Sequence, residues 1–243
     1  MKIPREEVTR IEAYLREHVQ KIVPGAQVLA VGSYRRGKMS SGDADILIAP
    51  PEGKEDIEVM DRLLSSLHAT GFITDDLAGH EPVSVPTTKR SYMGVCREVG
   101  REGGGAVFRR IDLKVYPRSL FAFALLYFTG SDHFNRSMRW YCNNFHYNGH
   151  TAHTLSDEGL MPCMRDAKGK ITHKGVSYVC NTERDIFEIL GMDYKEPHER
   201  CVYNAAVTDM RGAHQISFGV EEENVGEDYA YHSDNSNSAG DTL

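Results

Sequence analysis

The sequence predicts an α+β protein, in which a mixed β-sheet is packed by two helices and is followed by a smaller α+β unit. Up to residue 116, two amphipathic helical patterns alternate with short apolar segments of strand-like spacing. Pro117 ends the strongest of these strand patterns, and helical patterns dominate after it. We therefore place one domain at residues 1–118 and a second at 119–210. Residues 211–243 are poor in apolar groups, and we expect them to be a disordered acidic tail.

The elements of the first domain follow from the spacing of its apolar residues. A helix is expected over residues 5–21, where helical spacing relates Val8, Ile11, Leu15 and Val19. A second amphipathic helix is expected over residues 57–70. Short apolar or alternating runs predict strands at residues 27–32, 43–49, 72 onward, 92–99 and 107–116.

The second domain begins with helices and ends with one. Helical patterns cover residues 119–128, 131–142 and 182–190. Thr182 suits the N-cap of the last helix, and Asp185 suits its first turn. Residues 143–174, which are rich in Asn, His, Gly and Ser, predict only short strand-like pieces.

Composition limits the class of protein. The net charge of −7 comes entirely from residues 212–243, which hold seven acids and no Lys or Arg, so the rest of the chain is formally neutral and can still carry a basic face. The five cysteines form no CxxC pair, which favours reduced thiols in a cytosolic or nuclear protein. No run of eighteen apolar residues occurs, so we expect no membrane partner.

The segment VGSYRRGKMSSGDADILI, residues 31–48, resembles a P-loop at first sight. Gly32 is followed after four residues by Gly37 and Lys38, which is the P-loop spacing. A P-loop continues with Ser or Thr, whose hydroxyl binds Mg²⁺, but Met39 stands there. The match is therefore interpreted as a coincidence, and the segment as a different kind of phosphate site.

Polar groups suited to phosphate oxygens occur along this segment. Gly32 and Ser33 offer backbone N–H groups and a hydroxyl, and Arg36 offers a guanidinium fork. Ser41 and Gly42 repeat the hydroxyl and the open backbone just before two acids. We predict that these residues bind phosphate oxygens.

Three aspartates are candidates for a metal site. Asp43 and Asp45 point to the same side of a strand, and Asp112 stands inside an apolar strand, where Asp is unfavourable. If the two strands pair side by side, three carboxylates converge, and such oxygen ligands favour Mg²⁺ or Mn²⁺. The alternative is a surface strand, with Asp112 as an isolated partner of Arg110.

A resemblance to a known family is carried by four blocks in a fixed order, which read GSYRRGKMSSGDADILI, RRIDLKVYP, LLYFTGSDHFNRSMR and TERDIFEILGMDYKEPHER. In these blocks the chain resembles the family X DNA polymerases of the beta and lambda kind, from about residue 2 to residue 201. The resemblance implies a nucleotidyltransferase palm in the first domain and a nucleotide-binding, or thumb, subdomain in the second.

The resemblance also implies a reaction and its cofactors. Asp43, Asp45 and Asp112 would bind two Mg²⁺ ions, for which Mn²⁺ can substitute, and Asp112 would also assist deprotonation of the primer 3′-hydroxyl. Arg110 would orient the carboxylates. The hydroxyl would attack the α-phosphate of a dNTP and release pyrophosphate. The triphosphate would be bound by Gly32, Ser33, Arg36, Ser41 and Gly42.

The third block implies the sugar pocket. Tyr127 and Phe128 would line it and discriminate against a 2′-hydroxyl. Gly130 would begin a non-proline cis peptide bond. The other large apolar residues around them fit a core, and Tyr127 is the better functional candidate because it stands just before Thr-Gly-Ser.

The same block implies contacts to bases and to DNA. Asp132 would stack near the incoming base, and Asn135 would contact its minor-groove edge. Arg139 would contact the template strand of a primer–template or gapped duplex. A solvated helix face is the alternative for the arginine.

Departures from the family pattern lead to further expectations. The chain shows no upstream helix-hairpin-helix or lyase domain, so no lyase activity is expected from it. A family glutamate that pairs with a basic residue near the third Asp is placed at Gly149, opposite Lys114, which would affect closing of the thumb. A zinc site is one interpretation of three nearby histidines, and buried or exposed histidines are the other: His146, His150 and His153.

The predicted function is template-directed, gap-filling DNA synthesis in repair. One alternative is a template-independent terminal-type nucleotidyltransferase, although such enzymes usually carry Trp where Tyr127 and Phe128 stand. The other is a truncated, weakly active scaffold for DNA-repair proteins. By resemblance we expect a monomer in the nucleus, with DNA-repair proteins as possible partners.

Overall fold

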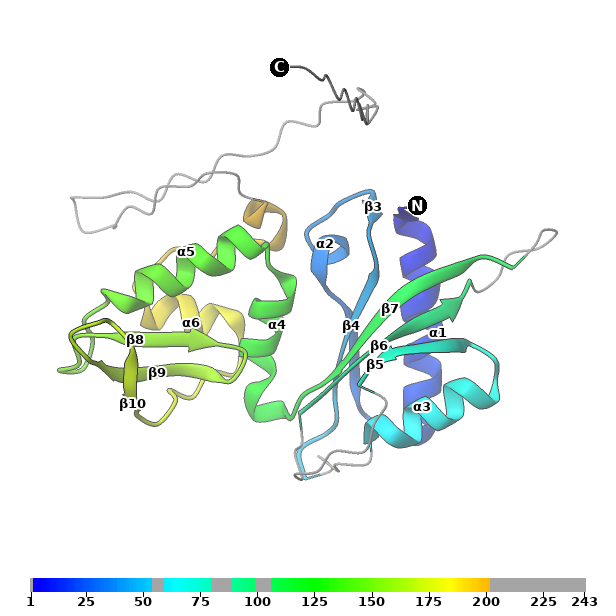
Figure 1. The fold of residues 1–243 in the computed structure, drawn as a ribbon, viewed down its shortest axis with the longest axis horizontal. Coiled ribbons are helices and arrows are strands. Elements are labelled where there is room, and N and C mark those ends of the chain that lie inside the picture. The colour runs from blue at the N-terminus through cyan, green and yellow to red at the C-terminus, as the bar shows by residue number, and fades with distance from the viewer. Residues whose placement is uncertain (1, 54–58, 80–88, 99–105, 202–243) are drawn as a thin grey trace, which may run out of the picture.

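The computed structural model describes residues 2–53, 59–79, 89–98 and 106–201 (Figure 1). A five-stranded sheet with its helices comes first, and a smaller α+β part follows beside it (Figure 1). The predicted α+β class is therefore confirmed. The expected acidic tail lies outside the described residues.

The large sheet is mixed and has the order β2-β4-β7-β6-β5. Its strands are β2 (Gln27–Ala30), β4 (Ala44–Ala49), β7 (Phe108–Val115), β6 (Arg90–Arg97) and β5 (Ile73–Ala78). β4 and β7 run parallel, and the other neighbours are antiparallel. All five strands were expected. β4 begins one residue later than predicted, so that Asp43 lies in the bend before the strand.

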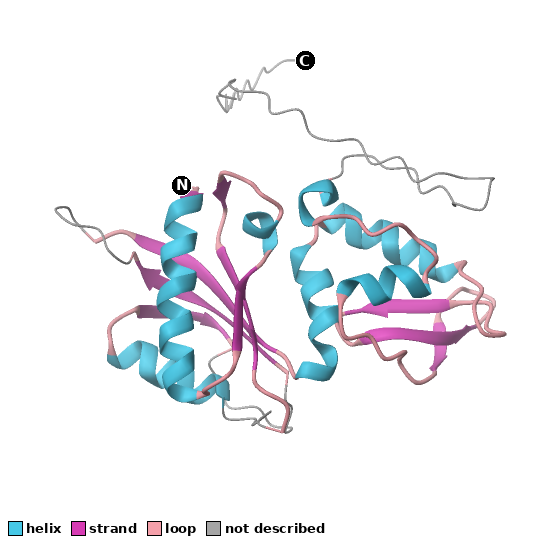
Figure 2. Ribbon diagram, turned by 180° about the vertical axis from the view of Figure 1, so that it is seen from behind, coloured by secondary structure: helices cyan, strands magenta, loops and turns pink. Residues whose placement is uncertain are grey.

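Two helices, α1 (Arg5–Ile22) and α3 (Val59–Ala69), cover one face of this sheet (Figure 2). The predicted apolar stripe of α1 is buried, because Val8, Ile11 and Leu15 are all 0% exposed. The opposite face of β4 packs against α4 (Phe121–Thr129) through a separate core cluster that includes Leu47 and Ala124. Strand β4 is therefore covered on both faces, which explains its continuous apolar run.

The second part of the structure packs its helices around a three-stranded antiparallel sheet of order β10-β9-β8. After α4 come α5 (Asp132–Asn143), β8 (His153–Ser156), β9 (Gly159–Arg165), β10 (Ile171–Lys174), α6 (Glu183–Ile189) and the 3₁₀ helix η2 (Pro197–Arg200), while another 3₁₀ helix, η1 (Arg118–Leu120), precedes α4. Thr182 caps α6 and Asp185 lies in its first turn, as predicted, and the two residues form a capping box. No helix in the described ranges is long and apolar enough to cross a bilayer, including the nine-residue and strongly apolar α4.

In the first part of the structure, three short elements have no counterpart in the predictions. They are β1 (Ile3–Pro4), the one-turn helix α2 (Gly32–Arg35) and β3 (Ser40–Ser41), which pairs antiparallel with β1. Elements of two to four residues are too short for a periodic pattern, and β1–β3 forms only because distant segments meet. We call residues 32–41, from α2 through β3, the strap.

The histidines of the second part do not gather around a metal position. His153 is 0% exposed, and its Nδ1 lies 2.8 Å from the Phe145 carbonyl oxygen and its Nε2 3.1 Å from the Tyr178 hydroxyl. Both ring nitrogens therefore have protein partners. Burial and the nearby rings of His150 and His146 lower the pKa of His153 below its ordinary value, despite the hydrogen bond to Phe145. The buried-histidine interpretation is the one that fits His153.

Candidate active site

Three carboxylates converge at one end of the β4–β7 pair. The parallel register places Asp45 of β4 directly beside Asp112 of β7, and Asp43 stands in the bend just ahead of β4. One oxygen from each carboxylate lies within 4.8 Å of the others. Among the described residues this is the one group of three or more His, Cys, Asp or Glu side chains with such spacing. The surface-strand alternative, in which Asp112 pairs with Arg110 alone, does not fit this geometry.

The electrostatics of the three carboxylates suit a cation. Burial raises the pKa of Asp45 to about 6, and the neighbouring charge of Asp112 adds to this, against the opposing effects of Lys114 and Arg36. Asp112 is 9% exposed, and its Oδ1 is buried without a hydrogen-bond partner in the described part of the chain. A buried unsatisfied carboxylate oxygen beside two further carboxylates fits hard divalent cations such as Mg²⁺.

Arg110 lies beside two of the three acids, Asp43 and Asp112. Its Nη2 donates a hydrogen bond to Asp43 Oδ2, while its Nε lies 3.9 Å from Asp112 Oδ1. The second distance is beyond hydrogen-bonding range, so Asp43 is the principal partner. The guanidinium thus fixes the orientation of the Asp43 carboxylate, whose residue lies outside any regular strand.

Gly32, the first residue of the strap, lies directly against the carboxylate of Asp45. It has φ of +59°, and a Cβ at this position would lie 2.2 Å from Asp45 Oδ2. Only glycine accommodates both the backbone conformation and the close carboxylate. Ser33 and Ser41 meet across the strap, where the Ser33 hydroxyl donates to Ser41 Oγ over 2.9 Å. Next along the chain, a Cβ added to Gly42 would meet no described atom within 4 Å, so the backbone there is open to a ligand.

Arg36 connects the strap to α4. Its Nη1 donates to the carbonyl oxygen of Thr129 over 2.6 Å, and its Nε is buried with no hydrogen-bond partner among the described atoms. The peptide bond that follows, Gly130–Ser131, is cis, as the family resemblance implied. The unsatisfied Nε leaves this guanidinium with a donor for an oxygen ligand.

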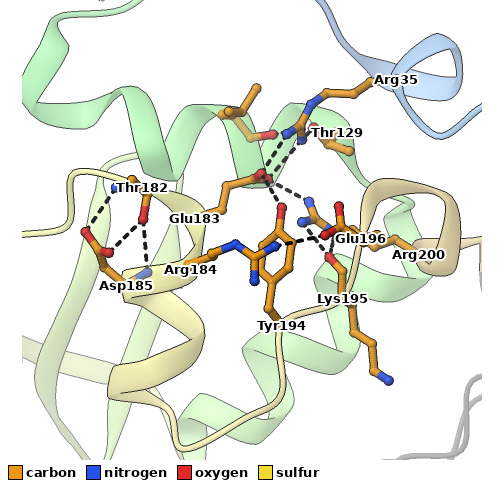
Figure 3. Close-up of polar contacts among 11 residues, drawn as sticks. Arg35, Thr129, Thr182, Glu183, Arg184, Asp185, Tyr194, Lys195, Glu196 and Arg200 are labelled. Atoms are coloured by element: carbon orange, nitrogen blue, oxygen red, sulfur yellow. Dashed lines mark hydrogen bonds and ion pairs between the residues drawn. The ribbon is translucent and has the colours of Figure 1, made fainter.

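Arg35, next to Arg36, enters a buried ionic cluster that the sequence did not reveal (Figure 3). Glu183 accepts hydrogen bonds from Arg35 (2.7 and 3.0 Å), from Arg200 (2.6 Å) and from the Tyr194 hydroxyl (3.2 Å). Arg35 also donates to Thr129 Oγ1 over 2.6 Å. These contacts link the strap to α4, α6 and η2, so the strap and the second part of the structure are held together.

The glutamate of this cluster is ionised. Burial raises the pKa of Glu183, but hydrogen bonds and charges from Arg35 and Arg200 outweigh burial and hold the pKa below its ordinary value. In the sequence, Glu183 and Arg200 both lie in the block TERDIFEILGMDYKEPHER, but nothing in this block indicates that their side chains contact each other.

The residues predicted to face sugar, base and DNA lie on α4 and α5. Tyr127 is 37% exposed and packs edge to face on Phe128. Asn135 Nδ2 donates to the Tyr127 carbonyl oxygen over 2.7 Å, and a small pocket between α4, α5 and β8 is lined in part by Tyr127, Asn135 and Arg139. Asp132 is exposed and accepts a hydrogen bond from Arg136 one turn along α5, and it is not among the residues that line this pocket.

The expectation for Gly149 is wrong. Gly149 lies in an exposed turn, and a Cβ there would meet no described atom within 4 Å, so a residue at this position does not pack against Lys114. The carboxylate that faces the sheet is Asp157, in the β8–β9 turn, which accepts hydrogen bonds from the Tyr116 hydroxyl (2.6 Å) and from Lys89 (3.1 Å). The sequence misled because residues 143–174 contain no strong pattern from which the turns could be aligned.

Two models of one known protein family match the chain. The family model described as the DNA polymerase beta palm matches residues 2–118, and the DNA polymerase beta thumb matches residues 124–201. Together the two models cover most of the chain.

Named relatives point the same way. The chain is 41% identical to DNA polymerase lambda of Rattus norvegicus over 200 residues, which are 82% of this chain and 33% of that protein. It is 34% identical to DNA polymerase lambda of Arabidopsis thaliana, again over 82% of this chain but 36% of the relative. It is 29% identical to the human DNA-directed DNA/RNA polymerase mu over 81% of this chain and 41% of that protein. The chain thus spans about a third of the length of the lambda polymerases it matches. With both structural units of one family matched in order, the chain belongs to the DNA polymerase beta family, the family X DNA polymerases.

Proposed function

We propose that this chain catalyses template-directed addition of dNTPs to a primer 3′-hydroxyl, as in the filling of short gaps during DNA repair. Residues 1–118 would act as the palm and 119–210 as the thumb. The observation that carries the proposal is the convergence of Asp43, Asp45 and Asp112 within 4.8 Å, beside the strap in which Ser33 and Ser41 meet.

The three aspartates are the groups that would hold two Mg²⁺ ions, or Mn²⁺ in their place. When bound, such ions stabilise charge on the attacking and leaving oxygens. Asp112, with its unsatisfied Oδ1, is the candidate to accept the proton of the primer 3′-hydroxyl. Arg110 keeps the Asp43 carboxylate oriented through its hydrogen bond.

The nucleotide would be bound by two surfaces. Gly32, Ser33, Arg36, Ser41 and Gly42 would bind the triphosphate, and Arg36 would use the Nε that has no partner among the described atoms. The sugar and base would lie against α4 and α5, where the candidate residues are Tyr127, Phe128, Gly130, Asp132 and Asn135. Arg139, which lines the same small pocket, would contact the template strand.

The proposed reaction needs no reactant other than the primer and the dNTP. The primer 3′-oxygen forms a bond to the α-phosphorus, the bond from that phosphorus to the bridging oxygen breaks, and pyrophosphate leaves. The 3′-hydroxyl proton passes to Asp112 and from there to solvent. The products are a primer longer by one nucleotide and pyrophosphate.

The test is incorporation of a single dNTP into a one-nucleotide-gapped duplex with Mg²⁺. Wild type should add the complementary nucleotide, and Asp112→Asn should not. Asp166→Asn is the matched control, because Asp166 accepts backbone hydrogen bonds in the β9–β10 turn and Asn can accept them too. Equal activity of Asp112→Asn and wild type would overturn the proposal. Addition that ignores the template base would indicate a terminal-type transferase. A lack of incorporation by wild type would indicate a non-enzymatic scaffold.

We further propose that the protein acts as a nuclear monomer alongside DNA-repair proteins. The support is membership of a family whose relatives here are DNA polymerases. Size-exclusion chromatography with light scattering and localisation of a tagged chain would check these points separately from activity.

A further inference from the structure

Besides its contacts to α4 and α6, the strap is held by the segment at residues 3–9. β1 pairs with β3 through Ile3–Ser41 and Pro4–Ser40. The backbone N–H of Arg5 continues this pairing with a 2.9 Å hydrogen bond to the Met39 carbonyl oxygen. The outer end of the strap is thereby fixed to the first turn of α1.

The side chain of Arg5 fixes the middle of the strap. Its Nη1 donates to the carbonyl oxygen of Tyr34 over 2.6 Å and to that of Lys38 over 3.3 Å. The guanidinium carbon lies 4.2 Å from the centre of the Tyr34 ring, in a cation–π contact. The Tyr34 hydroxyl lies 3.0 Å from Thr9 Oγ1 on the next turn of α1. Arg5 thus bridges Tyr34 and Lys38, the two ends of the turn with which α2 finishes.

This turn determines where two proposed phosphate ligands lie. Ser33 precedes Tyr34, and Arg36 lies between the two carbonyl groups that Arg5 binds. Within the turn, Lys38 N–H donates to the Ser33 carbonyl oxygen and Gly37 N–H to that of Tyr34. A shift of the Tyr34 and Lys38 carbonyls would therefore move Ser33 and Arg36 together.

We propose that Arg5 is a positioning residue for the triphosphate pocket, which it orders through Tyr34 and Lys38. This inference rests on the proposed function, because it assumes that Ser33 and Arg36 bind the triphosphate. A preformed pocket does not have to be ordered when nucleotide binds, so its affinity for nucleotide is higher. Lysine cannot replace Arg5 fully, because an ammonium group lacks the flat fork that both spans two carbonyls and lies on a ring.

The experiment compares Arg5→Met and Arg5→Lys with Arg16→Met in steady-state gap filling. Arg16 is a matched control, because it lies on the same helix and bonds a carboxylate and a carbonyl, Glu12 and Val28, neither of which belongs to the strap. We expect Arg5→Met to raise the dNTP KM roughly tenfold, which corresponds to a weakening of the pocket's own contacts to the triphosphate by about one charge-assisted hydrogen bond. The kcat and the KM for DNA should change much less, and Arg5→Lys should be intermediate.

A second measurement isolates the triphosphate from the base and sugar. Inorganic tripolyphosphate should inhibit the wild type competitively with dNTP, and Arg5→Met should raise its inhibition constant by the same factor as the dNTP KM. Thermal unfolding of Arg5→Met and Arg16→Met is compared to show that both variants are folded.

The outcomes separate this inference from the proposed function. If wild type incorporates nucleotide but Arg5→Met and Arg16→Met have the same dNTP KM, Arg5 has no positioning role. A loss in kcat alone, with unchanged KM and tripolyphosphate inhibition, would overturn the inference as well. If wild type fails to incorporate any nucleotide, the proposed function itself fails.

Discussion

Arg200 is fully buried and donates a 2.6 Å hydrogen bond to Glu183, which Arg35 of the strap also binds. A charge in such a position is tolerated only while its partner remains, because removal of one member leaves the other buried and unpaired. The Glu183–Arg200 pair therefore stabilises the second part of the structure. Through the contact of Glu183 with Arg35, it also holds the strap in position (Figure 3).

Substitution of Glu183 should strongly destabilise the protein. We expect Glu183→Ala to lower the free energy of unfolding by about 3–5 kcal/mol, because Arg200 is then left without a counter-charge. Urea denaturation followed by circular dichroism measures the change. Glu17→Ala is the control, since Glu17 pairs with Lys21 at the exposed surface of α1 and its loss should cost far less. Similar losses in the two variants would contradict the prediction.

Gly32→Ala should strongly lower gap-filling activity for a reason other than backbone strain. Gly32 and Gly149 both have positive φ, so alanine costs about 1–2 kcal/mol at either position. Of these two positions, only at 32 would the new Cβ collide with a carboxylate, that of Asp45. Gap filling should fall roughly hundredfold in Gly32→Ala, as expected when a catalytic group is displaced by about 1 Å, and should persist in Gly149→Ala. Equal gap-filling activities of Gly32→Ala and Gly149→Ala would show that a displacement of Asp45 does not affect catalysis.

Acid should weaken the second part of the structure through His153. Because its pKa is lowered in the folded state, the unfolded state takes up a proton first as the pH falls. The stabilisation is thus fully present above pH 6.5, the ordinary value, and is lost progressively as the pH falls below it.

Thermal unfolding at about pH 7.5, 6.5 and 5.5, on either side of the ordinary histidine pKa, tests this prediction for His153. In His153→Gln the decrease in Tm across this pH range should be smaller than in wild type, even if the variant is less stable throughout. His173→Gln, at an exposed position of β10, should keep the wild-type slope. An unchanged slope in His153→Gln would assign the acid sensitivity to other groups.

The chain should bind divalent cations at the three aspartates before any DNA is added. Electron paramagnetic resonance of free Mn²⁺ should show binding to wild type that Mg²⁺ displaces. Asp45→Asn should weaken it by at least about tenfold, since even an indirect partner of a metal ligand contributes that much. Asp166→Asn should bind as wild type does. Binding that survives in Asp45→Asn would place the ion elsewhere.

The main elements and the acids of the site were predictable from local patterns. Helical spacing identified α1 through residues such as Ile11 and Leu15, and the alternation around Asp45 identified β4. Asp112 was recognisable as a candidate metal ligand because an acidic residue inside an apolar strand is energetically unfavourable unless its function requires it. By contrast, the short β1–β3 pairing and the facing of Asp157 toward Tyr116 were not predicted, since neither has a periodic signal.

The sequence by itself determined the α+β class, the order of the long elements and the types of groups available for chemistry, because side-chain periodicity and local propensity act over neighbouring residues. The tertiary structure alone decided that the parallel register brings Asp45 beside Asp112, and that Glu183 joins Arg35 to Arg200 across 148 and 17 residues of chain. It also decided that Arg5 holds the strap from 29 and 33 residues away. Such pairings depend on how separate elements pack around a shared core, and no local pattern in the chain encodes that packing.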